Sequence, residues 1–205
     1  MNLRLPHSDY NRDTSEDHRL KADKQKIYQE LLVLRCKRGD KQALAGLVRL
    51  WEKRLFYYVR RLVGTEEDAW DTLQRVWMKV LMGIKSLKNP RNLPTWLYRI
   101  TRNTALSHLR ERYKAQEHLD EGCDLGNAEV TEEAPCFEDV ELVHHGLGRI
   151  SLGHRDVLTL YFLQDLSIEE IAVVLAIPLG TVKSRLYHAK RALRNVLERK
   201  RTNHE

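Results

Sequence analysis

A stretch near the C-terminus constrains the fold most strongly, because it predicts two short helices joined by a tight turn. Ser167 followed three residues later by Glu170 forms a capping box, in which both side chains satisfy free amides at a helix start. Apolar residues then recur at helical spacing. Pro178 ends this helix, Gly180 gives the backbone freedom for the turn, and a second helix is predicted from about Thr181.

The second helix has an apolar side and a polar side. Its apolar stripe consists of Val182, Leu186, Ala189, Leu193 and Val196 or Leu197. At about 100° per residue, the opposite side carries Lys183, Ser184, Tyr187, His188, Arg191 and Arg194. Residues 179–201 include eight Lys or Arg and one acid. An ordinary solvated basic helix is the alternative, but the turn chemistry favours a helix-turn-helix that enters a DNA major groove.

Composition restricts the class of protein further. The chain has 205 residues and a formal net charge of +6, with the positive charge concentrated locally, which fits a polyanionic partner. It shows no apolar run of membrane-spanning length and no signal-peptide pattern. Its three cysteines have no repeated spacing, so no disulfide framework is expected. We therefore expect a cytoplasmic, reduced protein.

The pattern along the chain predicts an all-α fold with two small helical domains. Residues 1–26 are charged and poor in apolar groups, so we expect a mobile tail. Helical periodicity covers residues 27–112 and returns over residues 141–205, with no alternation that would indicate a sheet. Between them, residues 113–140 are predicted to form an acidic flexible linker, since the segment from Tyr113 through Glu141 holds ten acids and one lysine.

One helix of the first domain is clearly amphipathic. Its predicted apolar stripe consists of Leu73, Val76, Trp77, Val80 and Leu81, and its polar side of Asp71, Gln74, Arg75 and Lys79. We expect Trp77 to belong to the core because it lies within the stripe. Cys36 lies on another helix of apolar pattern and is also expected to be buried.

A loop from Leu87 to Thr95 follows this helix and holds two prolines, two asparagines and two basic residues. Residues 88–114 carry seven basic residues and one acid, interleaved with Trp96, Tyr98 and Tyr113. Aromatic rings among basic groups suit single-stranded nucleic acid, because exposed bases stack and phosphates need neutralising. The alternative is an ordinary surface helix whose Trp and Tyr are packed.

Three segments in order, 66–80, 96–110 and 166–193, make the chain resemble an extracytoplasmic-function (ECF) sigma factor of the sigma-70 family. The resemblance covers roughly residues 27–200. It implies a protein that is not an enzyme, needs no cofactor or metal, and binds RNA polymerase core at the β′ clamp helices. The first domain would also open the −10 element, and the second would read the −35 element as duplex. Members are commonly held inactive by an anti-sigma factor, so that partner is expected too.

The resemblance also assigns roles residue by residue. Core polymerase contact is implied for Asp71, Gln74 and Arg75. Contact with −10 DNA is implied for Leu87, Lys88, Asn89, Arg91, Asn92, Tyr98, Arg102, Asn103 and Ser107. Contact with −35 DNA is implied for Thr181, Lys183, Ser184, Tyr187, His188, Arg191 and Arg194.

The chain departs from the family pattern at three places. Arg75 stands where the family usually has an acid, and Trp70 stands where an acid is common. The loop begins Leu87-Lys88-Asn89 rather than with an aromatic residue followed by Arg-Gly, so its base preference does not transfer from relatives.

Three other classes of protein compete with this interpretation. A stand-alone helix-turn-helix regulator would share only the C-terminal domain, and a pure interaction protein would need no promoter contacts. An enzyme would need a site, but the candidate metal ligands have spacings that fit no compact one. These are His118, Cys123, Cys136, His144 and His145. A run-off assay with core polymerase separates all of these classes.

Overall fold

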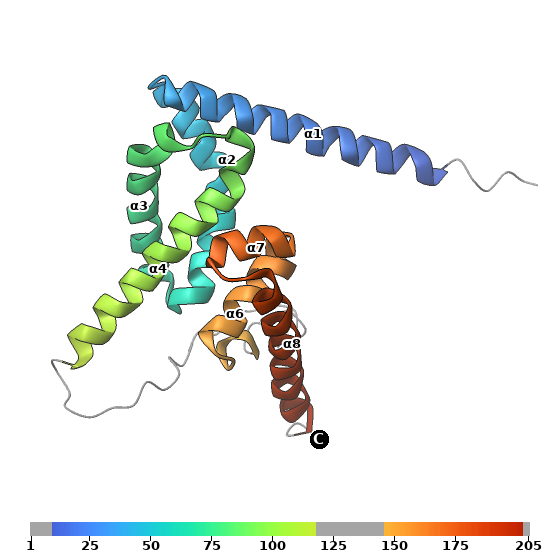
Figure 1. Cartoon of the computed structure of the whole chain (residues 1–205), viewed down its shortest axis with the longest axis vertical. Helices are drawn as coiled ribbons and strands as arrows, with labels where there is room; N and C mark the ends of the chain where they lie inside the picture. Colours follow the sequence, from blue (N-terminus) through green and yellow to red (C-terminus); the bar gives the residue numbers. More distant parts are fainter. Residues whose placement is uncertain (1–9, 118–145, 203–205) are drawn as a thin grey trace, which may run out of the picture.

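The computed structural model describes residues 10–117 and 146–202, and within these ranges every regular element is a helix (Figure 1). The predicted all-α class is therefore confirmed. The N-terminal elements are α1 (Tyr10–Lys37), α2 (Lys41–Val63), α3 (Glu66–Gly83), η1 (Ile84–Ser86), η2 (Pro90–Asn92) and α4 (Leu93–Glu117). The C-terminal elements are α6 (Leu152–Leu158), η3 (Thr159–Leu163), α7 (Ile168–Leu175) and α8 (Leu179–Thr202).

The first lobe is built from α2, α3 and α4, which pack against one another. Asp40 caps α2, since its carboxylate accepts hydrogen bonds from the amides of Gln42 and Ala43. The turn from α2 to α3 passes through Gly64 at φ +93°, a conformation that favours glycine. Trp77 packs against this core as predicted.

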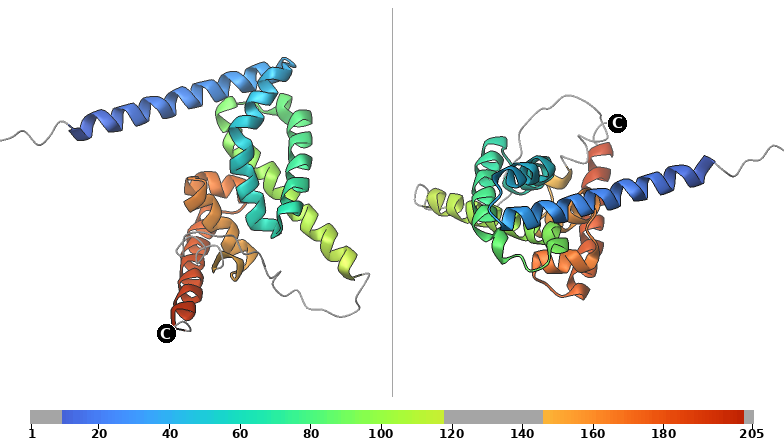
Figure 2. Two further views of the ribbon diagram at one scale, coloured as in Figure 1. Left: turned by 180° about the vertical axis from the view of Figure 1, so that it is seen from behind. Right: turned by 90° about the horizontal axis from the view of Figure 1, so that it is seen from above.

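Helix α1 corrects the expectation of a mobile tail over residues 1–26. The helix begins at Tyr10, so residues 10–26 are helical, and residues 1–9 lie outside the described residues. Figures 1 and 2 show α1 projecting from the body of the molecule. Its inner side buries Leu32, Val33 and Cys36, which confirms the burial of that cysteine. Its outer side exposes Leu20, Ile27, Leu31 and Leu34.

The C-terminal lobe contains the predicted helix-turn-helix, formed by α7 and α8. The capping box is present, because the Ser167 side chain accepts from the amide of Glu170 and the Glu170 carboxylate accepts from the amide of Ser167. The predicted turn chemistry was wrong, however. Ala176, not a glycine, adopts the left-handed conformation at φ +54°, and α8 already begins at Leu179, so Gly180 lies inside it.

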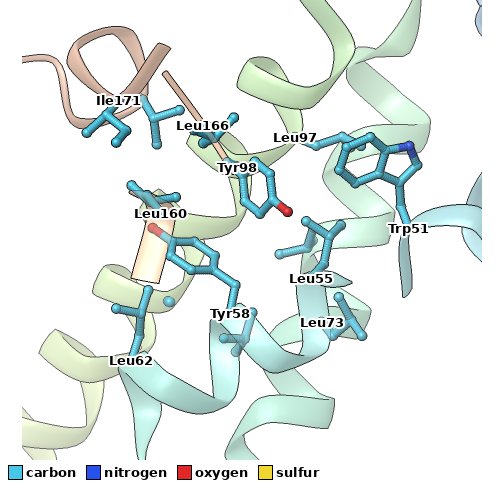
Figure 3. Close-up of a cluster of buried hydrophobic side chains, with 14 of the residues drawn as sticks. Trp51, Leu55, Tyr58, Leu62, Leu73, Leu97, Tyr98, Leu160, Leu166 and Ile171 are labelled. Atoms are coloured by element: carbon cyan, nitrogen blue, oxygen red, sulfur yellow. The ribbon is translucent and has the colours of Figure 1, made fainter. Parts of the chain in front are cut away.

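The two lobes pack directly on each other. Helix α4 contacts α7, and α2 contacts both α6 and η3. Figure 3 shows Tyr58 and Tyr98 of the first lobe among side chains from both lobes, including Leu160 and Ile171. Helix α4 extends to Glu117, so the predicted linker 113–140 begins too early, and its remainder lies outside the described residues.

Candidate nucleic-acid and protein interfaces

The amphipathic pattern predicted for the second helix of the helix-turn-helix is present in α8. Val182, Leu186 and Ala189 are buried, and Leu193 and Val196 pack against the core. The opposite side exposes Lys183, Ser184, Tyr187, His188, Arg191 and Arg194, while Thr181 is half-buried at the start of the helix. This side therefore presents a compact row of donors and rings with two arginines farther along.

Two local contacts organise the exposed side of α8. The Ser184 hydroxyl donates to the carbonyl of Thr181 at 3.1 Å. The Tyr187 and His188 rings meet edge to face with centroids 5.3 Å apart. Because Tyr187 remains 64% exposed, this ring pair stays open to solvent.

The loop predicted over Leu87–Thr95 is shorter in the structure, because α4 begins at Leu93. Leu87 is buried, so its place in the predicted DNA-contact set is wrong for the side chain. Asn89 shapes the turn by accepting from the amide of Arg91 at 3.0 Å. Arg91 pairs with Glu30 of α1 at 3.3 Å, which ties the turn to the first helix. Four side chains of the turn remain exposed: Lys88, Asn89, Arg91 and Asn92.

Helix α4 divides the predicted −10 residues between two sides. Tyr98 is 1% exposed, packs edge to face on Trp51 and Tyr58, and donates its hydroxyl proton to Gln164. Burial raises the pKa of Tyr98 well above its ordinary value. The Arg102 side chain is 19% exposed and pairs with Asp156 of α6. In this structure neither side chain is open for the implied −10 contact, because Tyr98 lies on the buried side of α4 and Arg102 is engaged by the C-terminal lobe.

The outer side of α4 carries the remaining predicted −10 residues of this helix. Asn103 is exposed and Ser107 is half-buried, and helical spacing places both on one side with the exposed Arg99 and Arg110. Sequence analysis missed these two arginines. Arg99 lies four residues before Asn103 and Arg110 three residues after Ser107, a helical spacing that would have placed them on the same side.

Helix α3 presents an exposed apolar surface beside two of the predicted core contacts. Asp71 and Gln74 are exposed. Four large apolar side chains on the same helix are also exposed: Trp70, Met78, Leu81 and Met82. The prediction that Leu81 belongs to the buried stripe was wrong, because it lies about 100° from Val80 on the helix.

Polar contacts fix α3 against α4 at the edge of this surface. Arg75 pairs with Glu111 at 2.8 Å, so it is held at the edge nearest α4. Asp68 accepts from the Thr65 hydroxyl and pairs with His108 and Arg112 at 2.9 and 2.8 Å. Partial burial alone would raise the pKa of Asp68, but these partners hold it below its ordinary value.

Comparison with protein families gives two matches in chain order. Residues 47–115 match the model of sigma-70 region 2, and residues 142–193 match the model of sigma-70 region 4. The chain is also 31% identical over 178 residues to the RNA polymerase sigma-H factor of Pseudomonas aeruginosa, covering 82% of this chain and 92% of that protein. The chain belongs to the ECF sigma factors of the sigma-70 family. It is an RNA polymerase sigma factor.

A second relative of this sigma factor agrees with that assignment, and two solved structures share its fold. The ECF sigma factor SigW of Bacillus subtilis is 28% identical over 178 residues, which cover 80% of this chain and 94% of SigW. The fold matches that of CnrH, solved in complex with the cytosolic domain of CnrY, with a TM-score of 0.64 and 22% identity. The match covers 83% of this chain and 97% of CnrH. It also matches the fold of RpoE of Bartonella quintana, solved in complex with the anti-sigma factor NepR, with a TM-score of 0.63 and 24% identity. This match covers 74% of this chain and 94% of RpoE.

Two further observations concern the described residues of this sigma factor. Over residues 10–117 and 146–202, no helix combines the length and hydrophobicity of a membrane span. The same ranges hold no cluster of three or more potential metal ligands. The five residues considered for a metal site, His118, Cys123, Cys136, His144 and His145, fall outside the described residues.

Proposed function

We propose that this sigma factor binds RNA polymerase core and directs it to promoters by contacts to both the −35 and the −10 elements. The observation that carries the proposal is the match to region 2 and region 4 in order, with exposed polar surfaces in each. It acts as an initiation factor without chemistry of its own.

The core polymerase contact is assigned to the exposed side of α3. Asp71 and Gln74 supply the polar contacts, and Met78, Leu81 and Met82 supply apolar area next to them. Apolar groups that are exposed together mark protein interaction surfaces, because covering them from water stabilises the complex. In this arrangement Arg75 lies at the rim.

The two DNA contacts are assigned to different elements. Lys88, Asn89, Arg91 and Asn92 of the short turn, with Asn103 and Ser107 of α4, contact the melted −10 strand. The exposed side of α8 enters the major groove of the −35 element: Thr181, Lys183, Ser184, Tyr187 and His188 meet base edges, and Arg191 and Arg194 meet phosphates. This division follows from their order along a groove-bound helix, whose first turns lie deepest.

An anti-sigma factor is the further partner we propose. CnrH and the Bartonella RpoE, which share this fold, were solved in complex with CnrY and with the anti-sigma factor NepR. A partner of this kind would compete with core polymerase for surfaces of the sigma factor.

A run-off transcription assay tests the proposal. Purified sigma factor and core polymerase should together produce transcripts from a subset of promoters, with shared −35 and −10 elements, whereas core alone should not. A stand-alone helix-turn-helix regulator would bind duplex DNA without core and would leave start-site selection unchanged. That result would refute the proposal.

A further inference from the structure

Helix α1 carries an apolar stripe on the side that faces away from the body of the molecule. The stripe consists of Leu20, Ile27, Leu31 and Leu34. All four side chains are between 48% and 67% exposed. Residues two apart on a helix point about 200° from each other, so Leu31 and Leu34 lie opposite the buried Val33 and Cys36. The outer stripe is therefore separate from the side by which α1 packs, and Figures 1 and 2 show the helix projecting from the body.

The stripe has the spacing of a coiled-coil seam. When Lys24 is included, its members follow one another at intervals of four, three, four and three residues. In heptad notation Leu20, Ile27 and Leu34 occupy d positions. Lys24 and Leu31 occupy a positions, and the seam extends over two heptads, or about 21 Å. A narrow a/d seam packs knobs into holes against another helix, so the occupant that fits this surface is a helix of the same pattern.

The charges beside the seam favour a second copy of this chain as that helix. Asp23 and Glu30 occupy g positions on one flank, and Tyr28 and Arg35 occupy e positions on the other. In a parallel pair, each g position faces the e position five residues later in the other helix, so Glu30 meets Arg35 of the other copy and Asp23 meets Tyr28. Two-fold symmetry forms each pair twice. An antiparallel pair would place acids against acids, so the flanks specify a parallel arrangement.

Lys24 supports the same arrangement. A single polar residue at an a position specifies register at a cost in stability. In a parallel pair, an a side chain packs beside the preceding g position of the partner, so the Lys24 ammonium lies next to the Asp23 carboxylate of the other copy. The two lysines also face each other across the seam. This layer therefore fixes the register and weakens the dimer at the same time.

The existing contacts of the flanking side chains are compatible with the pair. Glu30 accepts from Arg91 through Oε1 at 3.3 Å, and Arg35 Nη2 pairs with Asp40 at 2.7 Å. A carboxylate accepts several hydrogen bonds and a guanidinium has five donors, so both groups can take a further partner. The body of each copy packs on the opposite side of α1, so the two bodies lie outside the pair.

We propose that the outer stripe of α1 joins two copies of this chain in a short parallel coiled coil. A seam of two heptads with one lysine layer is at the small end of specific interfaces, so the dimer is weak and its population depends on protein concentration. The stripe lies before residue 47, where the match to sigma-70 region 2 begins. It is also separate from the surfaces of α3, α4 and α8 assigned to polymerase and DNA. The inference therefore stands independently of the proposed function.

Analytical ultracentrifugation of the full-length protein over a concentration series measures the dimer dissociation constant. Lys24→Leu replaces the polar layer by an apolar one and removes the repulsion between the two lysines, so it should lower this constant by about tenfold. Lys26→Leu is the matched control, because the same substitution is made at an exposed position about 200° away, and it should leave the constant unchanged. Ile27→Glu should raise the constant by about tenfold, whereas Gln25→Glu, outside the seam, should not.

Cross-linking tests the orientation. In a parallel pair the d side chains of the same number face each other, so Leu20→Cys should form a disulfide-linked dimer with oxidised glutathione, in excess of any formed by the wild-type protein. Gln25→Cys, outside the seam, should show no such excess. Equal linkage of the two variants would overturn the parallel arrangement.

The same measurements can overturn the dimer itself. A wild-type protein that remains monomeric throughout the series would do so, and so would equal effects of Lys24→Leu and Lys26→Leu, which would indicate non-specific association. A wild-type dissociation constant for Ile27→Glu would show that another surface associates. All of these positions are exposed, and circular dichroism verifies that each variant is folded. Failure of the wild-type protein in run-off transcription would instead refute the proposed function, without affecting the ultracentrifugation result.

Discussion

Replacing Arg155 by alanine removes the group that holds the start of the C-terminal lobe together. Its guanidinium donates to three carbonyls of the segment before α6: Leu147 at 2.8 Å, Gly148 at 2.7 Å and Ile150 at 3.3 Å. A fourth bond reaches the carbonyl of Arg61 in the first lobe at 3.1 Å. Alanine leaves all four acceptors without this donor.

The expected loss follows from these four bonds. A hydrogen bond to a charged group contributes about 1.5–3 kcal/mol when buried, but Arg155 is half-buried and water replaces part of what is lost. We therefore expect Arg155→Ala to lower the free energy of unfolding by about 3 kcal/mol. Arg155→Lys should lose about half of that, because an ammonium group cannot reproduce the planar fork of donors.

Urea unfolding followed by two probes measures this effect lobe by lobe. All four tryptophans, Trp51, Trp70, Trp77 and Trp96, lie in the first lobe, so their fluorescence reports that lobe, while circular dichroism at 222 nm reports both. Arg155→Ala should shift the circular dichroism transition more than the fluorescence transition. Arg149→Ala, an exposed neighbour, is the control and should change stability by less than about 0.5 kcal/mol. A loss below about 1 kcal/mol for Arg155→Ala would refute the reasoning.

Three further predictions concern polymerase, promoter and pH. The double variant Asp71→Ala with Gln74→Ala should weaken core binding about tenfold in a competition assay at unchanged melting temperature, since both side chains are exposed; wild-type affinity would contradict the assignment. A library of −35 promoter variants, assayed at two salt concentrations, separates base contacts from phosphate contacts. Lys183→Ala should reduce discrimination between bases at one −35 position by about 1–3 kcal/mol, whereas Arg191→Ala should weaken binding to all promoters alike and lower the salt dependence of binding by about one charge. The reverse pattern would show that the wrong residues were assigned to bases. Asp68→Asn should lower the free energy of unfolding by about 1 kcal/mol near pH 7. Because the folded pKa of Asp68 lies below its ordinary value of 3.8, this difference between variant and wild type should vanish as the pH falls through the folded pKa. A difference that persists in acid would exclude the ion pairs as its cause.

Periodicity and capping were sufficient to predict the helix-turn-helix. The capping box at Ser167 and the buried stripe of Val182, Leu186 and Ala189 depend on local spacing, which the sequence displays directly. The turn itself was mispredicted, because a glycine two residues into α8 gave a stronger signal than Ala176. An alanine tolerates the left-handed conformation when the helices on either side fix it, and that constraint is tertiary.

The burial of Tyr98 and Arg102 could not be predicted from the local sequence pattern. Both look like surface residues in a basic, aromatic stretch, and their partners Gln164 and Asp156 are more than fifty residues away in the chain. The contact between lobes decides their burial. The outer side of α4, in contrast, was partly predictable, since the spacing of Arg99 and Asn103 already indicated one shared side.

Helix α1 has apolar groups on two opposite sides, and only its last turns are packed. From Leu20 to Tyr28, every side chain that the structure describes is exposed, whereas Leu32 and Val33 are buried. Most helical stability in proteins comes from tertiary packing, which the projecting turns lack. We therefore expect these turns to melt at a lower temperature than either lobe, so that the helical content of the chain falls before the lobes unfold.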